Sequence, residues 1–414
     1  MRKGKVVLLV LLLALSLTAC TKKNEVTQMD ESTNIVTDAL TQTPTETPVV
    51  TATITPTDVA ESTDEPIAAD KTLKDVFSEH GLKVGTCLSE QMIMDDKCVD
   101  FIKANFSSIT FENRLKPDYI LNKTESQKTG ELVVSFDSTT KSLLDWCRDN
   151  DMKVRGHVLI WHSQTPDWIF YEGFDKSAGL VSREVMLERM ESYIKQTFET
   201  LEENGYLDLF YAYDIVNEAW MEDGSKRDSL WFKTIGDDYM WYAFNYANEY
   251  APDYIDIYYN DYNEQFKTET LLNFVQTLVD EDGNYLIDGV GLQGHLYTGD
   301  NIEDYLHTVE VLGATGLKIN LTELDVSLGT WQNINPATED NLKEQGRYYY
   351  NLVNGIFKLV DEDKVNMDSF TFWGFSDGLS WRRERSPMLL YTSFQKKYAY
   401  YGAIQQKDQA GFDE

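Results

Sequence analysis

Two short runs decide the fold: residues 211–218 read YAYDIVNE, and residues 318–323 read KINLTE. Both runs are rich in β-branched or aromatic residues, which favour strands, and each ends on a glutamate, Glu218 or Glu323. A carboxylate at the carboxyl end of a strand is where an α/β barrel places its reactive groups. The two runs therefore predict parallel barrel strands that bring both glutamates to one face.

From about residue 71 onward, short apolar runs alternate with helical patterns. The clearest helix is predicted over 182–203, with Ser182 as its N-cap and Asn204-Gly205 as its stop. Alternating strands and helices favour a parallel sheet, and eight units favour closure into a single (β/α)₈ TIM barrel of the α/β class. We expect the eight strands near residues 84–86, 107–111, 154–160, 212–217, 256–259, 290–293, 319–322 and 369–372.

Composition limits the kind of partner. The chain has 414 residues, of which 42% are hydrophobic, and a formal net charge of −32. Such acidity argues against nucleic acid, whose recognition needs a basic surface, and against an anionic membrane surface or a polyanionic substrate. We expect a neutral ligand or polymer as partner, and a monomer, because the sequence shows no coiled coil or interface stripe.

The N-terminal segment predicts export. Residues 1–20 read MRKGKVVLLVLLLALSLTAC, which combines a basic start, a short apolar run and small residues, as a secretory signal does. Residues 17–20 resemble a bacterial lipobox, so we expect lipidation at Cys20 and anchoring at the cell surface. An ordinary cleaved signal is the alternative. Residues 21–70 contain no glycine and no aromatic residue and predict a disordered tether. The catalytic domain would then span 71–405, with a tail at 406–414.

The remaining cysteines, Cys87, Cys98 and Cys147, form no C-x-x-C pair and no cluster with zinc spacing. We therefore expect no metal site and no cofactor. One disulfide stays open as an alternative, but buried free thiols are the expected state.

Taken in chain order, the predicted strand ends resemble glycoside hydrolase family 10, the retaining endo-β-1,4-xylanases. The segments are 109–117 (ITFENRLKP), 155–164 (RGHVLIWHSQ), 214–218 (DIVNE), 260–263 (NDYN), 291–295 (GLQGH), 322–325 (TELD) and 372–382 (FWGFSDGLSWR). The resemblance covers about residues 71–405. It implies a TIM-barrel hydrolase that cleaves internal β-1,4-xylosidic bonds of xylan by double displacement.

The resemblance also implies residue roles. Glu323 is the expected nucleophile and Glu218 the acid/base, with carboxyl groups about 5–5.5 Å apart. His295 and Asp325 are expected to orient Glu323, and Asn217 to bond the sugar 2-hydroxyl. The full set of expected substrate contacts is Glu112, Asn113, Lys116, His157, Trp161, Gln164, Asn217, Tyr262, Gln293, Trp373 and Trp381.

Within this set, the resemblance implies three groupings. Glu112, Asn113 and Lys116 would clamp the next sugar toward the non-reducing end. Gln164 and Tyr262 would contact the leaving-group side. Two tryptophans, Trp373 and Trp381, would form an aromatic roof over the cleft. The segment after Trp381 departs from the family pattern, because residues 382–386 read RRERS, and its three arginines predict contacts with acidic xylan side groups.

Two other functions stay open. An endo-β-1,4-glucanase of the same clan would keep both glutamates, and only the sugar-contacting residues favour xylan over glucan. A catalytically dead barrel that captures polysaccharide as a lipoprotein is the other alternative. The presence of both carboxylates together with Asn217, His295 and Asp325 argues against it.

Overall fold

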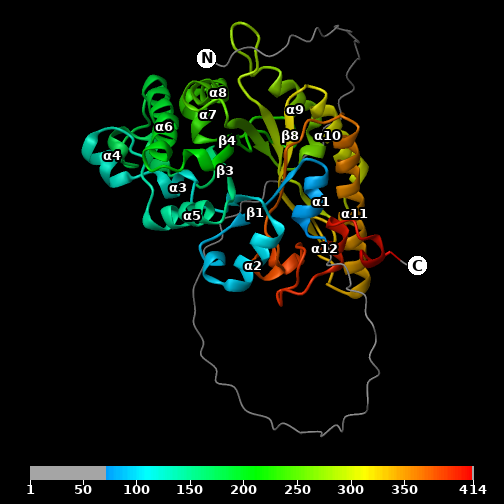
Figure 1. Ribbon diagram of the computed structural model, residues 1–414. Coiled ribbons are helices and arrows are strands. Elements are labelled where there is room, and N and C mark those ends of the chain that lie inside the picture. The colour runs from blue at the N-terminus through cyan, green and yellow to red at the C-terminus, as the bar shows by residue number, and fades with distance from the viewer. Residues whose placement is uncertain (1–70, 413–414) are drawn as a thin grey trace, which may run out of the picture. The chain divides into compact units, whose positions relative to one another are not determined.

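The computed structural model describes residues 71–412, with strands at its centre and helices around them (Figure 1). The predicted signal, lipidated Cys20 and tether lie outside these residues. The strands are β1 (Lys83–Leu88), β2 (Ser108–Phe111), β3 (Lys153–Ile160), β4 (Phe210–Asn217), β5 (Asp256–Asp261), β6 (Gly289–Leu292), β7 (His295–Tyr297), β8 (Lys318–Ser327) and β9 (Ser369–Phe372). The helices are α1 (Leu73–Glu79), α2 (Asp96–Asn105), α3 (Pro117–Ile120), α4 (Lys123–Thr129), α5 (Ser138–Asp149), α6 (Arg183–Glu203), α7 (Leu230–Ile235), α8 (Tyr239–Tyr250), α9 (Thr268–Val275), α10 (Ile302–Gly313), α11 (Glu339–Asp361) and α12 (Tyr398–Ala403).

Eight parallel strands close into a barrel, as the sequence predicts. The order is β6-β5-β4-β3-β2-β1-β9-β8, and β6 pairs with β8 to complete the ring. The short β7 follows β6 after two residues and also pairs with β8, which places His295 opposite Asp325. This second pairing explains why β8 runs on to Ser327, beyond the expected end at residue 322. The other seven strands lie within one or two residues of their expected positions.

Helix α6 shows how local signals set the element bounds. The Ser182 side chain accepts a hydrogen bond from the amide of Val185 and caps the first turn. Asn204 is the C-cap, and Gly205 follows with a φ of +71°, a conformation that glycine adopts without strain. The apolar residues spaced along one face are buried, so the predicted helix is confirmed.

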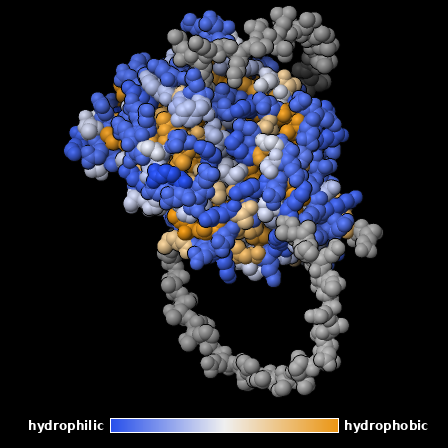
Figure 2. Space-filling model, in the orientation of Figure 1, coloured by the Kyte–Doolittle hydropathy of each residue, from blue (hydrophilic) through white to orange (hydrophobic). Residues whose placement is uncertain are grey.

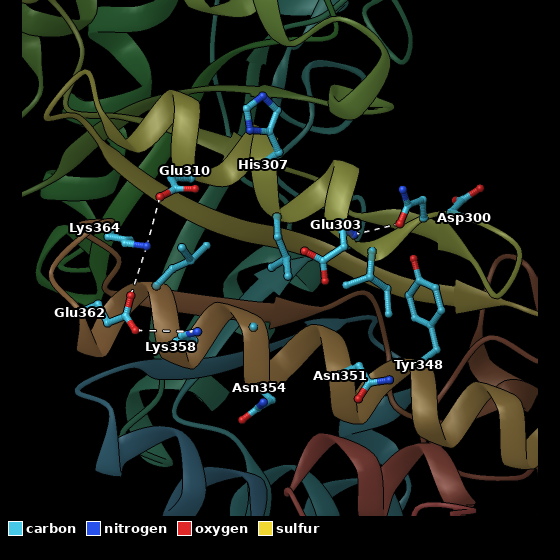
Figure 3. Close-up of a pocket in the computed structure, with 15 residues that line it drawn as sticks. Asp300, Glu303, His307, Glu310, Tyr348, Asn351, Asn354, Lys358, Glu362 and Lys364 are labelled. Atoms are coloured by element: carbon cyan, nitrogen blue, oxygen red, sulfur yellow. Dashed lines mark hydrogen bonds and ion pairs between the residues drawn. The ribbon is translucent and has the colours of Figure 1, made fainter.

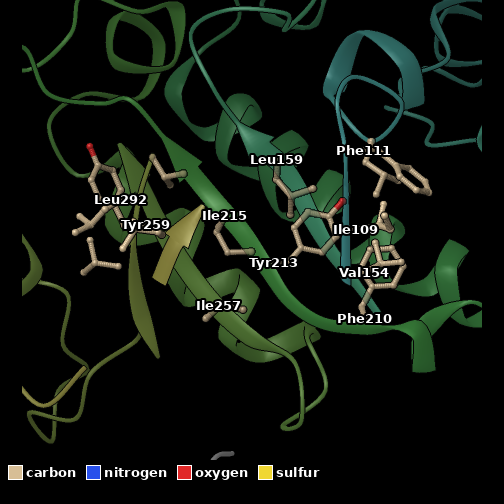
Figure 4. Packing of buried hydrophobic residues seen from close by; sticks show 14 of the residues in the cluster. Ile109, Phe111, Val154, Leu159, Phe210, Tyr213, Ile215, Ile257, Tyr259 and Leu292 are labelled. Atoms are coloured by element: carbon tan, nitrogen blue, oxygen red, sulfur yellow. The ribbon is translucent and has the colours of Figure 1, made fainter. Parts of the chain in front are cut away.

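The main core lies between the barrel and the helices. Figure 4 shows strand side chains of this layer, among them Ile109 on β2, Tyr213 and Ile215 on β4, and Ile257 on β5. Side chains alternate along a strand, so the residues between them face the barrel axis. One of these is the fully buried Asp214. The same alternation that builds the core therefore places polar groups inside the barrel.

The described residues include the three cysteines predicted to be free, and they define the surface of the domain. Cys87, Cys98 and Cys147 are buried and free, as expected. The face in Figure 2 is mostly hydrophilic, with smaller hydrophobic areas between. None of the helices within 71–412 combines the length and the apolar character needed to cross a membrane.

Residues 406–412 continue the packed domain, because Ala410 is buried and Arg347 donates to the carbonyl of Gly411.

Glu264, just after β5, is a fully buried carboxyl whose Oε2 has no hydrogen-bond partner among the described residues. Burial raises its pKa to about 8. The native state therefore keeps a proton that the unfolded chain releases near pH 4.5, and stability falls as pH rises from about 4.5 to about 8. We expect Glu264→Gln to remove this loss, so that its stability relative to the native protein rises by about 2–4 kcal/mol between pH 5 and pH 9.

The measurement is the thermal or denaturant midpoint of both proteins across that pH range. Glu269→Gln is the matched control, because Glu269 is exposed on α9. Parallel pH profiles for Glu264→Gln and the native protein would contradict the prediction.

Candidate active site

Glu218 lies directly after β4, where its carboxyl group receives three hydrogen bonds. Its Oε1 accepts from Gln293 Nε2 at 3.0 Å and from Asn217 Nδ2 at 3.3 Å, while Oε2 accepts from Trp161 Nε1 at 3.0 Å. Arg227 Nε donates to the Glu218 carbonyl at 2.8 Å and fixes the backbone at this turn. The side chain keeps 16% of its surface exposed, so a ligand can reach it.

Glu323 lies on β8 and is more deeply buried, with 6% of its side chain exposed. Its Oε1 accepts from Asn260 Nδ2 at 2.9 Å, and its Oε2 lies 3.3 Å from His295 Nε2. His157 Nε2 is 4.0 Å from Oε1. Burial opposes ionisation, but the bond from His295 and the charges nearby outweigh it and lower the pKa of Glu323. The group is therefore held as an anion.

Three amides connect the two carboxyl groups. Asn260 Nδ2 donates both to Glu323 Oε1 and to Asn217 Oδ1, the latter at 3.0 Å. Gln293 Nε2 donates both to Asn217 Oδ1 at 3.1 Å and to Glu218 Oε1. Because Asn217 and Asn260 pair across β4 and β5, the register of these strands sets the network. The structure thus brings both glutamates to one mouth of the barrel.

His295 bridges two carboxylates. Its Nδ1 lies 2.9 Å from Asp325 Oδ2, and its Nε2 faces Glu323. Burial disfavours the charged ring, but the charge of Asp325 and the bonds to both carboxylates raise the pKa of His295 to about 9. At neutral pH the ring is therefore an imidazolium that donates from both nitrogens. Asp325 also accepts from Trp381 Nε1 at 3.0 Å and from Arg382 Nη1 at 3.3 Å.

Three buried polar residues, Arg155, His157 and Asp214, lie inside the barrel below this mouth and bond one another. His157 Nδ1 lies 2.9 Å from Asp214 Oδ2, and Arg155 donates to the same carboxylate. Burial raises the cost of a charge on Asp214, yet Arg155 and His157 together lower its pKa. The guanidinium of Arg155 also lies 4.2 Å over the ring of Tyr258. The imidazole of His157 is thereby fixed beneath the cleft.

Two residues of the expected clamp, Asn113 and Lys116, bond each other and Gln164. Lys116 Nζ donates to Gln164 Oε1 at 2.8 Å and to Asn113 Oδ1 at 3.3 Å, and Gln164 Nε2 donates to Asn113 Oδ1 at 3.1 Å. Gln164 therefore lies with Asn113 and Lys116, and its expected contact with the leaving-group side stays a prediction. Its position depends on the loop after β3, where Gln164 has a φ of +43°. Burial lowers the pKa of Lys116 and raises that of Glu112.

The aromatic residues line the same mouth. Lys116 Nζ lies 5.0 Å over the ring of Trp161. Trp373 is buried and meets His157 edge-on at 5.6 Å, whereas Trp381 is 54% exposed and lies 5.1 Å from the ring of His295. Tyr262 accepts from Arg227 Nη2 at 2.8 Å, and Arg227 in turn contacts the Glu218 carbonyl. This chain of contacts places Tyr262 near Glu218.

Sequence reasoning missed three residues of the site, and for Arg382 it predicted a substrate contact but not the bond to Asp325. The first is Asn260, whose amide links Asn217 to Glu323. Its place at the end of a predicted strand could have marked it as a site residue, and the structure pairs it with Asn217. His162 Nδ1 lies 3.9 Å from Glu218 Oε2, and burial together with the charge of Arg227 lowers the pKa of His162 to about 4. The ring is therefore neutral at neutral pH. Arg227 and Arg382 lie on loops, where no periodic pattern marks them.

A separate groove lies away from these residues, on the outer helix layer. It has a volume of 760 Å³ and runs between α10 and α11 (Figure 3). Some of its charged residues pair with one another, as Lys364 does with Glu310 and Glu362. Within residues 71–412, no three histidine, cysteine or acidic side chains form a cluster that could hold a metal ion. The two amide-linked carboxylates, Glu218 and Glu323, are the candidate reactive groups because of the contacts described above.

His295→Asn tests the electrostatic support of Glu323. Loss of the imidazolium removes a bond to Glu323 and raises the pKa of that carboxyl, so the acidic limb of the kcat/KM profile should move to higher pH. We also expect kcat to fall by about 10²-fold. His307→Asn is the control, because His307 is exposed on α10. An unchanged acidic limb in His295→Asn would show that His295 does not support the charge.

The two carboxylates lie at the carboxyl ends of β4 and β8, which are the fourth and seventh strands of the barrel because the short β7 is not one of its eight strands. This arrangement in a parallel (β/α)₈ barrel defines a class of protein. It is the arrangement of the TIM-barrel glycoside hydrolases, in which two carboxyl groups flank the bond to be cleaved.

Comparison with known proteins identifies the family. Residues 72–406 match the family model of glycosyl hydrolase family 10, and the chain belongs to this family. It is 36% identical over 340 residues to the bifunctional endo-1,4-beta-xylanase XylA of Ruminococcus flavefaciens, covering 80% of this chain and 33% of that protein. It is 32% identical over 336 residues to endo-1,4-beta-xylanase B of Butyrivibrio fibrisolvens, covering 78% and 51%. The chain thus spans between a third and a half of the length of these relatives.

Solved structures agree with this fold. The CBM22-1–GH10 modules of Clostridium thermocellum endo-1,4-beta-D-xylanase 10B, complexed with xylohexaose, superpose with a TM-score of 0.73 at 30% identity. The match covers 85% of this chain and 71% of that one. The (β/α)₈ prediction is therefore confirmed.

Proposed function

We propose that this protein is an endo-β-1,4-xylanase that hydrolyses xylan with retention of anomeric configuration. The observation that carries the proposal is the pair of amide-linked carboxylates, one held as an anion by His295 and the other open to ligand. Family membership and the xylanase relatives support the same activity. No cofactor is needed, because the chain supplies the acid, the base and the nucleophile.

Glu323 fits the nucleophile, because its charge is stabilised before substrate arrives. It attacks the anomeric carbon while the bond to the leaving sugar oxygen breaks, giving a covalent glycosyl-enzyme. Glu218 is the more exposed group and fits the acid/base. It gives its proton to the leaving oxygen, and then takes a proton from the water that releases the sugar. Asn217, bonded to Glu218, is positioned to donate to the sugar 2-hydroxyl once substrate enters.

The substrate proposal rests on the groups around this pair. Asn113, Lys116 and Gln164 form a hydrogen-bonding clamp on one side, next to Glu112. Aromatic surfaces cover the mouth, as a sugar with apolar faces and polar edges requires. Trp373 and Trp381 would crowd the hydroxymethyl group that glucan carries and xylan lacks. This favours xylan over β-1,4-glucan.

Product analysis tests the proposal. The purified protein is incubated with birch xylan and with barley β-glucan, and products are followed by mass and anomeric NMR. Short xylo-oligosaccharides that form first as the β-anomer support a retaining endo-xylanase. Release from glucan alone would establish an endoglucanase instead. Binding to either polymer without cleavage would establish a capture protein.

We further propose that the protein is exported and anchored to the bacterial membrane by a lipid on Cys20. The support is the sequence of residues 1–20 and the lipobox-like LTAC, followed by the tether of 21–70. Incorporation of a labelled fatty acid in cells, lost in Cys20→Ala, is the expected result. Equal labelling of both, or none in either, would favour an ordinary signal.

The three arginines of residues 382–386, which we expected to contact acidic side groups of xylan, differ in their contacts with the rest of the protein. Arg382 bonds Asp325, and Arg385 donates to the carbonyls of Thr330 and Trp331. Arg383 is exposed, and it therefore carries the proposed contact with acidic side groups. We expect Arg383→Ala to lower kcat/KM on glucuronoxylan about threefold to tenfold and to leave undecorated xylan unaffected. An equal effect on both polymers, or none, would contradict this.

A further inference from the structure

Trp331 is exposed on the face of the barrel that carries the catalytic glutamates. All nine tryptophans of the chain lie in the described residues, and only Trp331, at 71%, and Trp381, at 54%, are exposed. Trp331 follows the carboxyl end of β8, the strand that holds Glu323. Loops after the carboxyl ends of barrel strands border the active site. None of the roles derived above uses this side chain.

Backbone hydrogen bonds fix the loop that carries Trp331. Gly329 N donates to Thr298 Oγ1, and Gly299 N donates to Gly329 O, each at 2.9 Å. Thr330 N donates to Asn333 O at 2.8 Å and closes a tight turn. Gly329 has a φ of +96°, and a Cβ there would lie 2.2 Å from Asn333 O, so the turn requires glycine. The exposed indole is thus presented on a preorganised loop.

Side-chain contacts connect this loop to the catalytic mouth. Arg385 binds the carbonyls of residues 330 and 331 from the segment that follows Trp381. The ring of Tyr297 meets Trp331 edge-on at 6.4 Å and lies 5.4 Å from the guanidinium groups of both Arg382 and Arg385. Arg382 lies 4.5 Å over the ring of Trp381. One continuous wall therefore runs from Trp381 to Trp331.

The surroundings of Trp331 suit a sugar better than a protein. Gln332 and Asn333 beside it are exposed and polar, and Ile334, at 49% exposure, is the one other large hydrophobic side chain of this loop that is exposed. Such an apolar patch is too small for a stable protein interface. An indole face next to amide groups matches a sugar ring, which has apolar faces and hydroxyl edges. A fixed loop also lowers the entropy lost on binding.

We propose that Trp331 is a distal sugar-binding platform, which holds a β-1,4-xylan chain beyond the sugars that lie against Trp381. The inference rests on the proposed xylanase function. It extends that function to the number of xylose units that the protein binds at once. A polymer reaches both tryptophans at once, whereas a short oligosaccharide reaches only the catalytic mouth.

The test compares Trp331→Ala with the native protein on substrates of different length. On xylohexaose and polymeric xylan we expect kcat/KM to fall about fivefold to tenfold, through a higher KM, because a binding contact remote from the reacting bond is lost. On an aryl β-xylobioside we expect a change of less than about twofold. Trp331→Tyr should recover part of the loss, because it restores an aromatic face.

Tyr254→Ala is the matched control, because Tyr254 is 58% exposed and precedes β5, at the opposite end of the barrel. An equal loss on short and long substrates, or no loss on either, overturns the platform while the xylanase proposal stands. A change in oligomeric state in place of a length-dependent loss overturns it in favour of a contact with a second copy. A native protein inactive on xylan overturns the proposed function and this inference together.

Discussion

Replacing Glu323 by alanine is expected to lower kcat on xylan by about 10⁵–10⁶-fold, the largest effect of any single change in this chain. The change removes the anion that we propose attacks the anomeric carbon. Asn260 and His295 lose their shared acceptor, but the barrel strands that carry them are unaffected. The measurement is kcat on xylan and on an activated aryl xylobioside, with the thermal midpoint as a control for folding.

Azide provides the decisive second readout for Glu323→Ala. The small anion can enter the space left by the carboxylate and attack the anomeric carbon directly, which displaces the leaving group once. We expect an α-glycosyl azide from an activated aryl β-xylobioside. Glu323→Gln keeps the size of the side chain and should stay inactive with azide. Full activity of either variant would show that another group is the nucleophile.

Replacing Glu218 by alanine is expected to give the second largest loss, about 10²–10⁴-fold on xylan, because the leaving sugar oxygen no longer receives a proton. The loss should depend on the leaving group. A dinitrophenyl xylobioside needs little proton transfer, so its first step should stay fast and glycosyl-enzyme should accumulate. A burst of dinitrophenol measured by stopped flow reports this.

Azide again distinguishes the role of Glu218. In Glu218→Ala the glycosyl-enzyme on Glu323 is intact, so azide attacks from the opposite face and the product is a β-glycosyl azide. Glu222→Ala is the matched control, because Glu222 follows the same strand and bonds Asn263 rather than the site amides. An equal loss on xylan and on the dinitrophenyl substrate would contradict the acid/base role.

The barrel and its two glutamates could be predicted because each depends on a local pattern. Strand-forming runs that end on Glu218 and Glu323 mark the carboxyl ends directly, and Ser182 with Asn204-Gly205 marks the bounds of a helix. The roles of His295 and Asp325 were expected from the family resemblance. These features need no knowledge of how distant segments meet.

The rest of the site depends on tertiary contacts that a single sequence does not specify. Asn260 links both carboxylates only because β4 and β5 pair in one register. Gln164 joins Lys116 because the loop after β3 turns toward the mouth. Arg382 reaches Asp325 from a loop that the sequence marked only by its charge. In each case the side chain was visible in the sequence, and its partner was not.

Asp325 joins two properties that enzyme engineering usually treats as separate. The same carboxylate holds the imidazolium beside Glu323 and the indole of Trp381, the proposed aromatic roof over the substrate. A redesign of the Trp381 loop for a new polysaccharide would therefore also alter the charge balance behind the nucleophile. We therefore expect substrate range and working pH to be coupled in this protein, so that directed evolution toward one shifts the other.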